Sequence, residues 1–111
     1  MVPENTTAIL ARNEVWSGEA ASEPYEAGWA REAVIFVRAL KTPVGTMPKA
    51  RVEISPDGMH WLPEGTVFDL PATKEAVAAA RVSHFGNWLR IAAQFDDGAA
   101  ATVLVTLHLK A

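Results

Sequence analysis

Three histidines and several carboxylates are the side chains of this sequence that could hold a metal ion. His60, His84 and His108 would supply imidazole nitrogens, and Asp57 or Asp96 would supply an oxygen. Local zinc motifs such as H-E-x-x-H place two such ligands on one turn of a helix. The three histidines match no such spacing. We therefore expect them to be ordinary surface or strand-end residues, and we predict no metal site and no cofactor.

Serines and glutamates could also take part in hydrolysis. A nucleophilic serine would need a G-x-S-x-G turn, and a carboxylate pair would need an apolar pocket to raise one pKa. The sequence offers neither for its four serines or for its N-terminal glutamates (Ser17, Ser22, Ser55, Ser83; Glu14, Glu19, Glu23, Glu26). Glycine-rich nucleotide motifs are absent as well. We predict that the chain is not an enzyme; a hydrolase would require a concave pocket with His60 or His84 beside a carboxylate.

Aromatic residues are the better candidates for ligand or partner binding. Exposed aromatic rings stack on sugars and anchor protein partners. Trp61 and Trp88 fall in expected strands, where we expect them to join the core. Trp16 and Trp29 flank an acidic loop that also carries Tyr25. We therefore predict Trp16, Tyr25 and Trp29 as the binding residues, and we keep packing of Trp16 and Trp29 against the end of the sandwich as the alternative.

Composition limits the class of protein. The 111 residues are 50% hydrophobic and 21% charged, with a net charge of -3, which predicts a single globular domain over residues 1–111. No long basic run favours nucleic acid, and no apolar run is long enough to span a membrane. The start carries no secretion signal, so a cytoplasmic or virion-associated location is favoured. Zero cysteines exclude disulfides.

Alternating apolar and polar residues predict short strands separated by turns. The expected strands are residues 6–15, 33–41, 50–55, 59–62, 66–70, 88–95 and 101–110, with a turn at 63–65. Residues 72–84 are ambiguous, because their alanines favour a helix while their second half alternates like a strand. We favour the strand and keep one short helix near residues 72–82 as the alternative. Seven or eight such strands predict an all-β fold, an antiparallel, jelly-roll-like β-sandwich.

Residues 16–28 are rich in Gly, Ser, Pro and Glu, which is typical of a long surface loop. We expect residues 1–28 to form a partly irregular N-terminal arm and loop. A clear turn follows the strand at 50–55. There Ser55, Asp57 and Gly58 supply turn chemistry, and Trp61 is expected to cover the sheet, so the unit is predicted to be a hairpin.

Two segments resemble known sandwich proteins. The hairpin from Val52 to Trp61 resembles the "S-x-D-G-x-x-W" unit of discoidin-type, galactose-binding-like jelly rolls, and the segment Asn87–Ile91 is similar to an aromatic-hydrophobic-Arg-hydrophobic strand of the same domains. The same two units, in the same order, also resemble small phage and prophage structural proteins. These proteins too end in a Thr/Val-rich strand and a lysine, like residues 101–110 here.

The phage-like resemblance implies a non-catalytic structural or assembly module of virion type. Such a module would act through protein–protein contacts as a homo-oligomer, and its N-terminal arm could add a strand to a neighbour. The discoidin-type resemblance implies the alternative, a binding module for carbohydrate or another small ligand that uses the loop aromatics.

Overall fold

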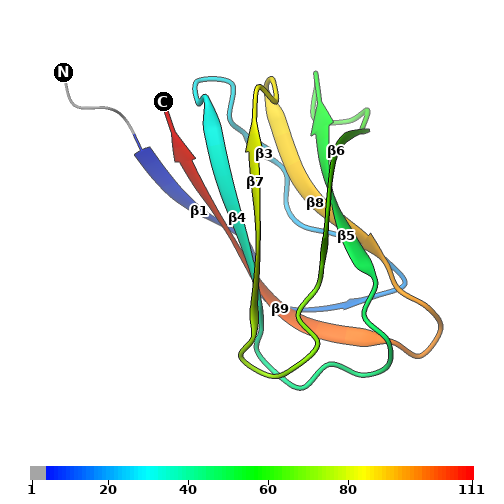
Figure 1. The fold of residues 1–111 in the computed structure, drawn as a ribbon. Coiled ribbons are helices and arrows are strands. Elements are labelled where there is room, and N and C mark those ends of the chain that lie inside the picture. The colour runs from blue at the N-terminus through cyan, green and yellow to red at the C-terminus, as the bar shows by residue number, and fades with distance from the viewer. Residues whose placement is uncertain (1–4) are drawn as a thin grey trace.

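Two antiparallel sheets pack face to face in the computed structural model, which describes residues 5–111 (Figure 1). The four-stranded sheet has the order β1 (Asn5–Ser17), β9 (Ala100–Lys110), β4 (Glu32–Ala39) and β7 (Val77–Ser83). The five-stranded sheet has the order β2 (Glu19–Ala21), β8 (Trp88–Gln94), β5 (Lys49–Ser55) and β6 (Leu62–Asp69), and β3 (Tyr25–Glu26) also pairs with β8. The predicted all-β antiparallel sandwich is confirmed. Residues 5–111 form nine strands, where seven or eight were expected.

The core lies between the inner faces of the two sheets. In β9 the buried positions alternate strictly, from Ala101 to Leu109, with half-buried residues between them. Ile35 and Val37 of β4 and Ile91 of β8 contribute further fully buried side chains. This period of two follows from the pleat of a strand, and the sequence pattern therefore located the core correctly.

The N-terminal segment is part of the sandwich rather than a free arm. β1 pairs with β9 from Asn5↔Lys110 to Ser17↔Ala100, and β2 and β3 pair with β8. The strand expected at residues 6–15 lies within β1, which runs on to Ser17, and the expected loop at 16–28 contains the short strands β2 and β3 with irregular residues 22–24 between them. Residues 1–4 lie outside the described part. The polar composition of residues 16–28 suggested a loop, but a strand at a sheet edge also carries many polar residues, because its outer face and its unpaired backbone edge are in contact with water.

Residues 72–82 contain no helix. A turn at residues 73–75 leads into β7, whose seven residues pair with β4 without interruption. The strand that we favoured for this segment is confirmed over residues 77–83 but not over residues 72–76, and the alternative of a short helix is wrong. The alanines favour a helix locally, but pairing along the whole of β4 outweighs a propensity of this kind.

The strand after the 55–58 turn begins later than expected. Residues 56–61 form the connection, and β6 then runs through Pro63 and Gly65 to Asp69. The predicted strand at 59–62 and the predicted turn at 63–65 are therefore wrong. A bulge in the pairing with β5 absorbs the turn-like residues, and Gly65 adopts a φ of 117° that favours glycine.

Candidate functional site

Trp16 lies in the core and not on the surface. It sits near the end of β1, opposite Ala101, and only 2% of its surface is exposed. Its Nε1–H finds no hydrogen-bond acceptor among the residues that the structure describes. Trp16 therefore cannot serve as a surface platform for a ligand, and the expectation that it is exposed is wrong.

The other two loop aromatics differ in exposure. Tyr25 is half-buried in β3, opposite Leu89, and packs against the core. Trp29 is 40% exposed in the connection from β3 to β4. Of the three residues proposed from the sequence, Trp29 is the most exposed, with 40% of its surface accessible to solvent.

The hairpin turn is organised by two short side chains. Ser55 Oγ accepts hydrogen bonds from the backbone N–H groups of Asp57 (3.2 Å) and Gly58 (2.8 Å) and donates to Asp57 Oδ1 (3.0 Å). Asp57 Oδ1 in turn accepts from the N–H groups of Met59 and His60, both at 2.9 Å. These bonds satisfy the turn's own backbone, which is the usual work of Ser and Asp in turns.

The same bonds change the acidity of Asp57. The backbone N–H of His60 is the largest cause that holds the pKa of this carboxyl well below its ordinary value, followed by the His60 side chain and the Met59 N–H. His60 Nδ1 lies 2.6 Å from Asp57 Oδ2. This pair is the histidine–carboxylate contact that a hydrolase would need. However, the His60 side chain is 80% exposed, so the pair does not lie in an enclosed pocket.

A buried carboxylate on the outer face of the five-stranded sheet was missed by the sequence analysis. Glu53 is 7% exposed, and it accepts hydrogen bonds from Arg51 Nε (3.1 Å) and Arg90 Nε (2.7 Å). Trp61 lies against Arg90 and is half-buried, as is Trp88; neither is the fully buried core residue that we expected. The strict alternation of β5 gave the outward direction of Arg51 and Glu53, but only the pairing Glu53↔Arg90 brings in the second arginine.

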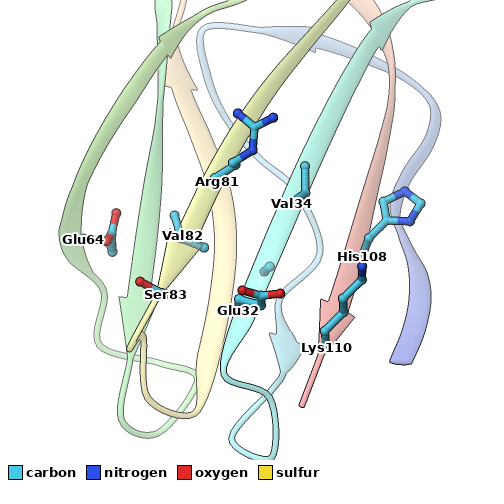
Figure 2. Close-up of a pocket in the computed structure, with 9 residues that line it drawn as sticks. Glu32, Val34, Glu64, Arg81, Val82, Ser83, His108 and Lys110 are labelled. Atoms are coloured by element: carbon cyan, nitrogen blue, oxygen red, sulfur yellow. The ribbon is translucent and has the colours of Figure 1, made fainter. Parts of the chain in front are cut away.

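A hollow of about 430 Å³ lies at one end of the four-stranded sheet (Figure 2). Its lining mixes charged and apolar side chains from β4, β6, β7 and β9 (Glu32, Ala33, Val34, Glu64, Arg81, Val82, Ser83, His108, Lys110). His108 Nδ1 lies 3.2 Å from Thr7 Oγ1, its Nε2 lies 3.3 Å from Thr106 Oγ1, and its ring stands edge-on to Phe36 at 5.1 Å. Both ring nitrogens of His108 thus lie beside threonine hydroxyls on the outer surface of the sheet.

Across residues 5–111, no three His, Cys, Asp or Glu side chains gather in a way that could hold a metal ion. Over the same residues no helix is long and apolar enough to cross a membrane.

The outer face of the four-stranded sheet carries an unusual share of apolar surface. The inward residues of β9 and β4 are the buried ones, so the residues that alternate with them along each strand point outward, as do the partners of those outward residues in register. Four exposed hydrophobic residues lie on this side: Ile9 and Phe36, both opposite Thr106, Val77, opposite Arg38, and Val15, opposite Thr102. Half-buried Val34 and Leu104 lie on the same side. We call these six residues the apolar outer face. Exposed apolar side chains that gather on one face of a sheet are typical of interaction sites.

Comparisons with known proteins find a similar fold among solved structures. No family model matches the chain, and no curated protein matches it either. Among solved structures, the SPBc2 prophage-derived protein YomS aligns with a TM-score of 0.65 at 9% identity, covering 100% of this chain and 96% of that one. A Bacillus endospore appendage protein, from a family of disulfide-linked pili, aligns with a TM-score of 0.48 at 12% identity, covering 97% and 86%. The chain thus shares its sandwich fold with a prophage-derived protein, as the sequence resemblance implied.

Proposed function

We propose that this protein is a non-catalytic structural module that assembles with further copies of itself, as a component of virion type. The observation that carries the proposal is the apolar outer face. A soluble sheet with one face in a core normally covers its other face with polar residues. Here Phe36 and Ile9 flank Thr106 on neighbouring strands, and exposed Val77 continues the apolar surface on β7.

The fold likeness supports the same proposal. The similar solved structure is prophage-derived, and such a fold is compatible with the virion-type role inferred from the sequence. We also assign the sandwich to the jelly-roll type, because the orders β1-β9-β4-β7 and β2-β8-β5-β6 make the chain cross between the sheets at most connections. Fold alone does not fix function, so the apolar outer face remains the main argument.

A carbohydrate-binding module is the weaker alternative. With Trp16 in the core, Trp29 is the exposed ring of the three proposed, and Tyr25 packs against the core. A sugar platform usually needs more than one free aromatic surface, and the structure gives this alternative less support than the sequence did.

Light scattering after size exclusion tests the proposal. The full-length protein is expected to elute as a multiple of its 12.0 kDa chain mass. The variant Phe36→Ser should shift the mass toward the monomer, because it removes apolar area from the centre of the apolar outer face. Val67→Ser is the matched control: Val67 is 59% exposed on the other sheet, opposite Arg51, and this variant should assemble as the wild type does.

A full-length protein that stays monomeric at high micromolar concentration would overturn the proposal. Circular dichroism of each variant establishes that its sandwich is folded before the masses are compared. We use substitutions and not a deletion of the N-terminal segment, because removing residues 1–28 would take away β1, which pairs with β9.

A further inference from the structure

We propose that two copies of this chain join through their β7 strands, edge to edge and antiparallel, so that the two four-stranded sheets become one continuous sheet. The inference rests on the proposed function, because it names the contact by which the module first pairs. It starts from a difference between the edges of the two sheets.

Three edges carry features that discourage strand pairing. β1 has two register shifts along its pairing with β9, a positive φ at Asn13, and a backbone carbonyl at Leu10 that already accepts from the Glu23 N–H. β6 carries Pro63 and the Gly65 bulge. β2 and β3 are three and two residues long. Natural proteins protect exposed edges by means of this kind.

The β7 edge carries none of these features. Its seven residues pair with β4 in one unbroken register from Val77↔Arg38 to Ser83↔Glu32, with no proline and no glycine. Arg81 is its single charged residue. No strand within residues 5–111 pairs with the opposite side of β7. A straight, mostly apolar edge of this length is a template for another strand.

The free hydrogen-bonding groups of β7 can be located from the register. At the two ends of the ladder, Ala39 N–H donates to Ala76 C=O (3.1 Å) and His84 N–H donates to Arg31 C=O (3.4 Å). Hydrogen-bonded pairs alternate along an antiparallel ladder, so residues 78, 80 and 82 bond to β4. The N–H and C=O groups of residues 77, 79, 81 and 83 therefore point away from β4, toward the open edge.

These four residues are complementary to the same four residues of a second copy. A two-fold axis at Ala80 places Val77 opposite the second copy's Ser83 and Ala79 opposite the second copy's Arg81. All four free residues then form hydrogen-bonded pairs, since each pair in this register joins two outward-facing positions. The long Arg81 side chain lies beside a small alanine, and no like charges stand directly opposite. The buried side chains of Ala80 and Val82 keep their inward direction.

Pairing at β7 would also enlarge the surface on which the proposed function rests. Val77 and Phe36 lie on the outer side of β7 and β4, so the two apolar outer faces become neighbours in the joined sheet. A second copy is thus the partner that the β7 edge fits best.

Disulfide trapping tests the pairing, because the natural chain has no cysteine. The double variant Val77→Cys/Ser83→Cys should form a covalent dimer under mild oxidation, since the register sets each new thiol opposite the other on the second copy. Within one chain the two positions are roughly 20 Å apart along the strand, too far for a disulfide. Val77→Cys alone and Ser83→Cys alone are the controls. Each should stay uncrosslinked, because identical positions are also roughly 20 Å apart across the two-fold axis.

A charge exchange at Ala79 checks the same register in solution. Ala79→Lys sets a lysine opposite Arg81 of the second copy and should dissociate the dimer, whereas Ala79→Glu sets a carboxylate there and should retain it. Val67→Lys, on the β6 edge, should leave the dimer intact.

An assembly that neither crosslinks at Val77→Cys/Ser83→Cys nor responds to Ala79→Lys would overturn the β7 pairing while leaving the proposed function in place. Dissociation by Ala79→Lys without crosslinking would equally overturn the two-fold register. A wild-type protein that is monomeric and does not crosslink would overturn both proposals.

Discussion

The guanidinium of Arg90 lies over the ring of Trp61, with its central carbon 4.3 Å from the ring centroid. Arg90 belongs to β8, whereas Trp61 ends the connection between β5 and β6. The stack thus ties the connection between β5 and β6 to β8, which lies on the other side of β5 from β6. It also holds Arg90 where its Nε–H reaches Glu53. Cation–π contact and ion pairing therefore act on one side chain.

Removing Arg90 should leave a nearly buried carboxylate with one arginine partner. We expect Arg90→Ala to lower the free energy of unfolding by about 2–3 kcal/mol, because Glu53 loses a charge-assisted bond and Trp61 loses its cover. Urea denaturation at neutral pH measures the change. Lys49→Ala is the control: its ion pair with Asp69 is 66% and 80% exposed, and its loss should cost less than about 1 kcal/mol. Equal effects of the two variants would contradict the role of Glu53 burial.

The turn carboxylate should make stability depend on pH in the acid range. The pKa of Asp57 is lowered in the folded protein, so its ionised form stabilises the fold above its ordinary pKa of 3.8, and this contribution is lost as the pH falls below that value. Asp57→Asn keeps an acceptor oxygen and removes the charge. We expect the variant to have a lower urea midpoint than the wild type at pH 7, with the gap narrowing toward pH 2. A gap that is constant between these pH values would show that the charge of Asp57 contributes nothing.

Gly58 should tolerate substitution less well than another glycine of the same backbone conformation. Gly58 and Gly98 have φ values of 79° and 82°, but a Cβ at Gly58 would stand 3.2 Å from Trp88 Cε2, whereas none of the described atoms lies within 4 Å at Gly98. We expect Gly98→Ala to cost about 1 kcal/mol from backbone strain alone. Gly58→Ala should cost about 1–2 kcal/mol more, because Trp88 must move. Thermal or chemical unfolding of both variants checks the difference.

Burial of Trp16 predicts that its substitutions lower stability more than substitution of Trp29, and that Trp16→Ala lowers it more than Trp16→Phe. Trp16→Ala should destabilise by about 3–5 kcal/mol through the cavity that it leaves. Trp16→Phe should cost less than about 2 kcal/mol, because it also removes an N–H that has no acceptor within residues 5–111. Trp29→Ala, at a 40% exposed position, should change stability by about 0.5 kcal/mol or less. If Trp29→Ala were as destabilising as Trp16→Ala, the assignment of the two rings would be wrong.

Local patterns in the sequence were sufficient where each side chain's environment depends on its near neighbours. The alternation in β9 and β5 identified the inward residues, since a strand repeats every two residues whatever it pairs with. For the same reason the all-β class and the antiparallel sandwich could be predicted. The segment 72–82 shows the limit, because its alanines permit a helix and only β4 makes it a strand.

Pairing between distant segments decided the rest. Trp16 and Trp29 stand in similar polar surroundings in the sequence, yet the ladder between β1 and β9 turns Trp16 into the core. Glu53 meets Arg90 because β5 and β8 are neighbours in one sheet. Val77 lies at a sheet edge because β7 is the last strand in the order β1-β9-β4-β7. Strand order, register and free edges are contacts between residues far apart in the chain. The sequence by itself therefore determined the inward residues of a regularly alternating strand such as β9, whereas the tertiary structure decided on which side Trp16 lies and which outward residues meet.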